Sequence, residues 1–177
     1  MYVIMIRHGE PDYKPCDDRI FIGHGRDLAP LTDKGIEQAK KVAKDPLLRG
    51  AKIILSSPYT RALQTAAFIA SELKLDIKIE VDLREWQPDL TFTYKTSEEA
   101  FALGREYDLL KGIYPQGETR KWESTEMLST RAVNCLKPYS NIYDKVVIVT
   151  HGMLMRQFIN EPIIPHCGMI DFNFTGS

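Results

Sequence analysis

The sequence predicts an α/β protein of three layers, in which helices cover both faces of a mainly parallel sheet. Two observations carry this prediction. Apolar runs at residues 2–6 and 146–149 suit strands that are buried on both faces of a parallel sheet. Segments with helical periodicity separate the predicted strands, as in folds that alternate strands and helices. We expect residues 1–177 to form a single domain.

The first half of the chain supplies two strands and two helices in alternation. After the strand at 2–6, a helix is predicted through about residue 42, with Thr32 as its N-cap. A second strand at 53–55 precedes a long helix at about 59–73. Apolar residues three and four apart in this helix predict one core-facing stripe. The residues of this stripe are Leu63, Ala66, Ala67, Ala70 and Leu73.

The middle of the chain is less regular. Residues 77–81 alternate between apolar and polar side chains, which predicts a strand with one exposed face. An irregular stretch at 83–94 follows. Two helices are then predicted at about 97–110 and 124–136, separated by a turn at Tyr114-Pro115-Gln116-Gly117.

The last part of the chain returns to the strand pattern. Residues 146–149 form the strongest predicted strand, and a helix is expected to begin after His151-Gly152. Residues 169–174 suit a final strand near an edge of the sheet.

The net charge, the apolar runs and the cysteines indicate which classes of partner and which cellular compartment to expect. The net charge is −1, so no basic excess favours nucleic acid or an anionic membrane. No apolar run approaches the roughly 20 residues that span a bilayer. Cys16, Cys135 and Cys167 are odd in number and form no C-x-x-C pair, which indicates thiols in a reducing compartment. We therefore expect a cytoplasmic protein, a monomer or a homodimer, whose partner is a small molecule.

Charged and polar residues follow three of the predicted strands. The strand ends carry Arg7-His8-Gly9-Glu10, Ser56-Ser57-Pro58 and Thr150-His151-Gly152, and Arg61 lies just inside the helix after the second strand. Ligands of open α/β sheets bind outside the carboxyl ends of the strands. Two histidines and two arginines are therefore expected to converge at one edge of the sheet.

This set of residues suits the transfer of a phosphoryl group. Arginine presents a rigid fork of donors to phosphate oxygens, so Arg7 and Arg61 are candidate phosphate ligands. The amide of Gly152, at a helix start, is expected to add a donor. A neutral imidazole is a nucleophile near neutral pH, so His8, the candidate nucleophile, could attack phosphorus without a metal or a cofactor.

The reaction also needs an acid that protonates the leaving oxygen. A carboxyl group beside bound phosphate has its pKa raised by the anion, which suits this task. Glu85 follows the third predicted strand, and Glu10 lies close to His8 in sequence. From position alone both carboxyl groups remain candidates.

Five segments together resemble the histidine phosphatase superfamily, also called phosphoglycerate mutase-like, and they follow that family's order. They are Arg7-His8-Gly9-Glu10, residues 31–39, residues 56–66, Leu83-Arg84-Glu85 and Thr150-His151-Gly152. The resemblance implies that fold, and it implies that His8 accepts the phosphoryl group. It further implies that Arg7, Arg61 and His151 hold the phosphoryl oxygens and that Glu85 is the proton donor. Gln116-Gly117-Glu118-Thr119 is similar to a G-E-S/T loop of the phosphatase branch.

Two departures favour the phosphatase branch of the family over the mutases. Mutases of the family have Ser, a spacer and Trp-Asn after the R-H-G-E motif, where this chain has Pro11-Asp12-Tyr13. The R-H-Y-G pattern that follows the mutase acid is absent, and Trp86-Gln87-Pro88-Asp89 stands after Glu85. The leaving group is expected to lie against residues 11–28 and 86–94.

Several other residues admit a structural role as well as a functional one. His24 could contact substrate from a loop over the site, or it could be a solvated loop residue. His166 is expected to belong to a turn, Glu118 to be structural or to lie on a rim, and Arg131 to form an ion pair within the scaffold. Trp86 and Trp122 are expected to pack in the core or in a lid.

The sequence therefore predicts a metal-independent phosphomonoester hydrolase, which acts on a small phosphorylated metabolite through a phosphohistidine at His8. A phosphoglycerate mutase-type transfer of the same fold is the first alternative. A non-catalytic phosphate-binding module is the second.

Overall fold

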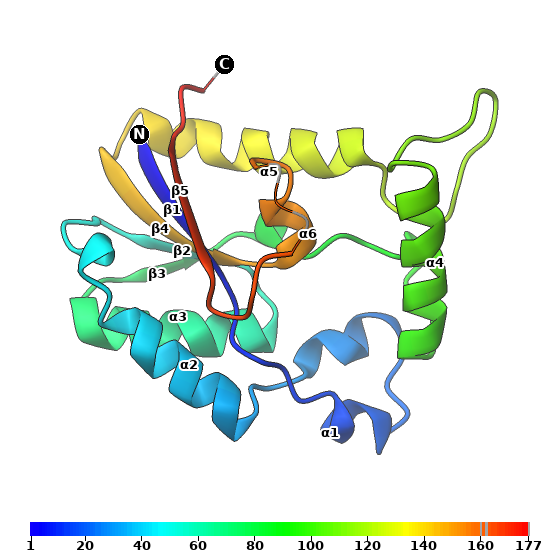
Figure 1. The fold of residues 1–177 in the computed structure, drawn as a ribbon, viewed down its shortest axis with the longest axis horizontal. Helices are drawn as coiled ribbons and strands as arrows, with labels where there is room; N and C mark the ends of the chain where they lie inside the picture. Colours follow the sequence, from blue (N-terminus) through cyan, green and yellow to red (C-terminus); the bar gives the residue numbers. More distant parts are fainter. Residues whose placement is uncertain (160, 162, 177) are drawn as a thin grey trace.

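Within residues 1–159, 161 and 163–176, which the structure describes, five strands form one sheet in the order β3-β2-β4-β1-β5. The computed structural model shows this sheet between two layers of helices (Figure 1). The strands are β1 (Tyr2–Arg7), β2 (Ile54–Ser56), β3 (Ile77–Ile79), β4 (Lys145–Thr150) and β5 (Met169–Asn173). β5 runs antiparallel to β1, and the other neighbouring strands are parallel, so the predicted mainly parallel α/β sheet is confirmed.

The helices form two layers and one outlying wall. α2 and α3 cover one face of the sheet, α5 and α6 cover the other, and α4 stands beside the sheet (Figure 1). The helices are α1 (Lys14–Asp17), α2 (Asp33–Ala43), α3 (Thr60–Leu73), α4 (Ser97–Leu109), α5 (Thr125–Ser140) and α6 (Gly152–Met155). Short 3-10 turns lie at Gly23–Leu28, Pro46–Leu48 and Val81–Leu83. No helix in the described part of the chain has the length and apolarity to cross a membrane.

The side chains of β1 and β4 point alternately into two hydrophobic cores, one on each face of the sheet. In β1, Ile4 and Ile6 pack with α2 and α3, whereas Val3 and Met5 pack with α5 and α6. Successive residues of a strand point to opposite faces, so a strand apolar at every position belongs between two layers. Trp122 lies in the α5 core, as expected of a packing residue, and it is fully buried.

Two details of the sequence prediction were wrong. The buried stripe of α3 consists of Ala62, Ala66 and Ile69, whereas Ala67 of the predicted stripe is exposed. Arg61 and Thr65 also lie on the buried side, because Arg61 lines a cavity and Thr65 binds the amide of Gly9, and this rotates the buried face away from the purely apolar positions. The strand predicted at 77–81 ends at Ile79. Ile79, an apolar residue of the face predicted to be covered, is 54% exposed, because β3 is the edge strand and little covers it there.

The segment after β1 packs its backbone directly against the start of α2. Thr32 caps this helix as predicted, because its side chain accepts a hydrogen bond from the amide of Gly35. A Cβ atom added at Gly35 would overlap the carbonyl oxygen of Glu10, and one added at Gly9 would overlap the carbonyl oxygen of Gly35. The absence of side chains at both glycines therefore lets the segment after β1 lie on α2.

We expect Gly35→Ala to lower the free energy of unfolding by about 1–3 kcal/mol, because overpacking against rigid backbone outweighs the roughly 1 kcal/mol gain in helix propensity. Gly104→Ala in α4 is the matched control, since the nearest atom to its added Cβ is Cζ3 of Trp86 at 3.9 Å. Urea unfolding of both variants measures the difference. Equal stability changes in the two variants would contradict the close approach of the backbones.

Candidate active site

The site lies where β1, β2 and β4 end. Arg7 pairs in register with Thr150, and Ser56 pairs with Val149, so the residues that follow these strands meet at one edge. The amide of His8 donates to the carbonyl of Thr150 at 3.0 Å. The convergence predicted from the strand ends is therefore what the topology produces.

His8 is held as a neutral imidazole with a defined tautomer. Its side chain is buried, and its Nδ1 lies 2.7 Å from the carbonyl oxygen of Gly9. A carbonyl can only accept, so Nδ1 carries the proton and Nε2 keeps its lone pair. Burial, followed by the positive charge of Arg61, holds the pKa of His8 well below its usual 6.5. Nε2 accepts a hydrogen bond from Nε of Arg61 at 3.3 Å.

Arg61 is positioned by aromatic rings and one carboxylate. It lies in the first turn of α3, and its guanidinium carbon is 5.0 Å from the ring centroid of Tyr59 and 5.8 Å from that of Tyr13. Its Nη1 lies 3.7 Å from Oδ1 of Asp27. These contacts fix the plane of the guanidinium while leaving donors for a ligand.

Arg7 provides the second guanidinium. Its Nη1 donates to the carbonyl of Ile164 at 2.5 Å, which orients the group. Burial lowers the pKa of Arg7, although an arginine stays charged. Gly152 begins α6 beside it, and a Cβ added there would lie 3.5 Å from Nε of Arg7. This is an ordinary van der Waals distance, so Gly152 lies directly beside the guanidinium, and its amide as a phosphate donor stays a prediction.

Buried nitrogen atoms without hydrogen-bond partners gather at this site. Among the described residues, four buried side-chain atoms lack a partner, and three of them are Arg7 Nε, Arg61 Nη1 and His151 Nδ1. Buried polar groups are nearly always paired in native proteins, because an unpaired one costs about 1–3 kcal/mol. Their concentration around His8 is typical of a site that is completed by an anionic ligand.

His151 is fully buried next to His8 and is not among the residues that line the cavity, so its contact with the phosphoryl oxygens stays a prediction. Its ring centroid is 5.0 Å from that of His8, at an interplanar angle of 62°. Its Nε2 lies 2.7 Å from the hydroxyl oxygen of Ser57. Burial and the charge of Arg61 lower the pKa of His151 well below 6.5, so this second ring is also neutral.

The pKa values of the two candidate acids are shifted in opposite directions by their surroundings. The carboxylate of Glu85 accepts from the amides of Trp86 at 2.8 Å and Met153 at 3.3 Å, but burial dominates and raises its pKa above 4.5. Glu10 forms an ion pair with Lys34 at 2.7 Å, which lowers its pKa. A carboxyl with a raised pKa is the better proton donor, so the geometry favours Glu85.

These residues face a cavity of about 780 Å³. His8, both arginines, Glu85 and also Glu10 are among the residues that line it. The expected segments after His8 and after Glu85 line it too, and so does α4, which sequence reasoning missed. These further residues include Pro11, Tyr13, Asp27, Pro88, Tyr94, Ser97, Phe101 and Arg105.

The three less certain sequence candidates have different positions. His24 does not line the cavity; it stacks on Phe92 at 4.2 Å and pairs with Asp27 at 2.7 Å, so its substrate contact stays a prediction. His166 lies in a turn as expected, but its ring lines the cavity 5.7 Å from that of His8. Glu118 is exposed and pairs with Arg120 at 2.7 Å.

The fold and the site together define a class: an α/β protein in which two arginines surround a neutral imidazole at the carboxyl edge of the sheet. We call this group of Arg7, Arg61 and His8 the cationic cup. The chain belongs to the histidine phosphatase superfamily (branch 1), whose family model matches residues 3–164. The predicted family and fold are thereby confirmed. Among the described residues, no three His, Cys, Asp or Glu side chains are grouped so that they could hold a metal ion.

Known relatives include both proteins named as mutases and proteins named as phosphatases. A probable phosphoglycerate mutase GpmB of Proteus mirabilis is 29% identical over 160 residues, covering 88% of this chain and 71% of the relative. An uncharacterized phosphatase PhoE of Bacillus subtilis is 27% identical over 164 residues, covering 90% and 76%. The solved phosphoserine phosphatase of Entamoeba histolytica, in complex with 3-phosphoglyceric acid, is 25% identical with a TM-score of 0.68, covering 98% and 90%.

Proposed function

We propose that this chain is a phosphomonoester hydrolase that acts on a small phosphorylated metabolite through a phosphohistidine at His8, without a metal. The observation that carries the proposal is the neutral Nε2 of His8, 3.3 Å from Nε of Arg61 and beside the unpaired donor of Arg7. An attacking lone pair and the cations that stabilise the transferring group thus lie in one buried cup.

The reaction has two balanced steps. In the first, Nε2 of His8 attacks phosphorus, the bond from phosphorus to the ester oxygen breaks, and Glu85 gives its proton to the leaving oxygen. In the second, Glu85 takes a proton from water, the water oxygen attacks phosphorus, and the P–N bond breaks to release orthophosphate. Arg7 and Arg61 hold the phosphoryl oxygens in both steps.

A release assay tests the proposal. We expect the purified protein to release orthophosphate from p-nitrophenyl phosphate, and to do so equally well in the presence of a chelator. Absence of release would favour a binding module that retains the phosphate cup. Strong inhibition by the chelator would overturn the metal-independent mechanism.

A phosphoglycerate mutase-type transfer is the second candidate, and the 29% identity to a probable phosphoglycerate mutase favours it. Asp27 and Asp108 line the cavity together with Arg26 and Arg105, so the charges of its wall do not select for the carboxylate that phosphoglycerate carries. Incubation with 3-phosphoglycerate and a bisphosphate primer separates the two candidates. We expect orthophosphate to form faster than the isomeric phosphoglycerate, and the reverse order would favour a mutase.

The pH dependence follows from the two pKa shifts. His8 is neutral above its lowered pKa, and Glu85 is protonated below its raised pKa, so the reaction requires a pH above the first and below the second. We expect kcat/KM for benzyl phosphate to fall as the pH rises through the pKa of Glu85. In Glu85→Gln the alkaline fall is expected to disappear. The ratio of the two pH profiles removes the ionisation of the substrate itself, and a ratio that is independent of pH would contradict the role of Glu85.

A further inference from the structure

The segment that carries Glu85 has little regular structure of its own. After the 3-10 turn at Val81–Leu83, the chain crosses the end of the sheet without forming a helix or a strand. A general acid needs a fixed position relative to the leaving oxygen, because displacement by about 1 Å can cost about 10²-fold in rate. Something outside this segment must therefore hold its main chain.

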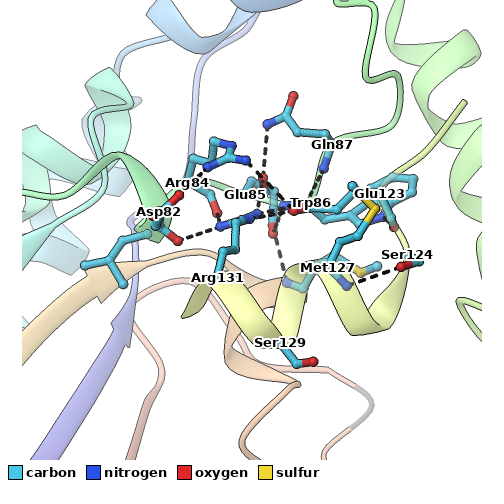
Figure 2. Close-up of polar contacts among 12 residues, drawn as sticks. Asp82, Arg84, Glu85, Trp86, Gln87, Glu123, Ser124, Met127, Ser129 and Arg131 are labelled. Atoms are coloured by element: carbon cyan, nitrogen blue, oxygen red, sulfur yellow. Dashed lines mark hydrogen bonds and ion pairs between the residues drawn. The ribbon is translucent and has the colours of Figure 1, made fainter. Parts of the chain in front are cut away.

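Arg131 of α5 supplies most of these contacts. Its side chain points from the helix toward the main chain of the Glu85 segment (Figure 2). Nη1 donates to the carbonyl oxygens of Asp82 at 2.6 Å and Arg84 at 3.0 Å, and Nη2 donates to that of Glu85 at 3.1 Å. One guanidinium thus binds two carbonyls that precede the acid and the carbonyl of the acid residue itself.

Glu123 orients this guanidinium and binds the next part of the same segment. Its Oε1 accepts from Nε of Arg131 at 2.6 Å, and its Oε2 accepts from Nη2 at 2.9 Å, which makes a bidentate pair (Figure 2). Oε2 also accepts from the amide of Gln87 at 3.1 Å, and the carbonyl of Glu123 accepts from the indole of Trp86 at 2.7 Å. The side chains of Arg131 and Glu123 are only 9% and 2% exposed.

We propose that Arg131 and Glu123 are positioning residues for proton transfer by Glu85, because their shared ion pair fixes the main chain on both sides of that acid. Neither side chain lines the cavity, so the pair acts through Glu85 and not on the substrate. Its local consequence is visible at the acid: the amide of Trp86, held by the indole contact to Glu123, binds Oε1 of Glu85. This inference rests on the proposed function, and specifically on Glu85 as the acid.

The leaving group provides a test that separates positioning from general stability. Nitrophenolate leaves without a proton at neutral pH, whereas the alkoxide of benzyl phosphate must be protonated as it leaves. In Arg131→Lys the charge remains, but a single ammonium cannot replace the fork that reaches Glu123 and three carbonyls. We expect kcat/KM to fall at least about tenfold more for benzyl phosphate than for p-nitrophenyl phosphate.

Arg49→Lys is the matched control, because Arg49 is exposed and is not among the residues that line the cavity. It is expected to leave both rates unchanged. Glu123→Gln is the second variant, since it removes the charge that orients Arg131, and it is expected to show the same selective loss. Circular dichroism checks that each variant is folded.

Other outcomes would overturn the inference. Equal losses on both esters, no loss on either, or failure of both variants to fold would assign the pair to the scaffold alone. Those outcomes leave the proposed function standing, because it depends on the wild-type rates and on His8. If instead the wild-type protein hydrolysed neither ester, the proposed function itself would fail, and the inference with it.

Discussion

His8→Ala is expected to lower kcat/KM for p-nitrophenyl phosphate by about 10⁴-fold or more, because the variant lacks the Nε2 atom that forms the covalent intermediate. The imidazole of His151 is not expected to take over, since it is fully buried and its Nε2 lies 2.7 Å from the hydroxyl oxygen of Ser57. The measurement is steady-state hydrolysis by the purified variant, with its fold checked by circular dichroism.

The matched measurement for this variant is binding of orthophosphate. Arg7 and Arg61 remain in place in His8→Ala, so we expect the variant to bind orthophosphate while failing to turn over substrate. Turnover within about tenfold of the wild-type rate would rule out His8 as the nucleophile. Loss of both turnover and folding would be resolved by His8→Asn, whose amide can still contact the carbonyl of Gly9.

Arg61→Ala is expected to lower kcat/KM by about 10³-fold, since a cationic donor aimed at the transferring phosphoryl group contributes about 10³–10⁵-fold in phosphoryl-transfer enzymes. Two effects add. The variant loses the guanidinium that holds phosphoryl oxygens, and the charge of Arg61, which lowers the pKa of His8, disappears. The pKa of His8 is therefore expected to rise, so the acidic limb of the pH profile moves toward neutrality.

Arg61→Lys separates these two effects. The ammonium keeps a positive charge near His8 but cannot present a planar fork, so we expect most of the rate loss without the full shift of the acidic limb. Arg49→Ala, at an exposed position, serves as the control for removing an arginine. Wild-type activity in Arg61→Ala would show that the cup does not bind the reacting group.

The sequence predicts the core of this site because its residues directly follow strands. Arg7 is the last residue of β1, His8 follows β1 and His151 follows β4, so a parallel sheet must bring them together whatever the loops do. Glu85 was left open against Glu10 by position alone. Only the structure shows that Lys34 pairs with Glu10 while burial raises the pKa of Glu85.

The cavity wall and the support of the acid could not be predicted in the same way. α4 is joined to the site by packing across space, and nothing in its sequence indicates that Phe101 and Arg105 face a cavity. His166 reaches the site because the amide of Cys167 binds the carbonyls of Arg7 and His8, which is a tertiary contact. The ion pair expected for Arg131 is confirmed, but its reach to the Glu85 segment depends on the path of an irregular loop.

The same reasoning explains the misplaced face of α3. Periodicity assigns the core side of a helix from apolar residues alone. In α3 the buried side also contains Arg61, which faces the catalytic cup, and Thr65, whose hydroxyl accepts from the amide of Gly9 at 3.1 Å. Because these polar residues are buried too, the buried face of α3 differs from the one that its apolar residues predict.

Direct detection of the phosphorylated residue tests the central claim most sharply. In Glu85→Gln, attack on p-nitrophenyl phosphate needs no acid, but the hydrolysis of the intermediate lacks its base, so the intermediate should accumulate. The protein is denatured in alkali, digested and analysed by mass spectrometry. We predict one acid-labile phosphoryl group on His8, absent when His8 is also replaced by alanine. Turnover with no phosphoryl group on His8, or a phosphoryl group on another residue, would contradict the account.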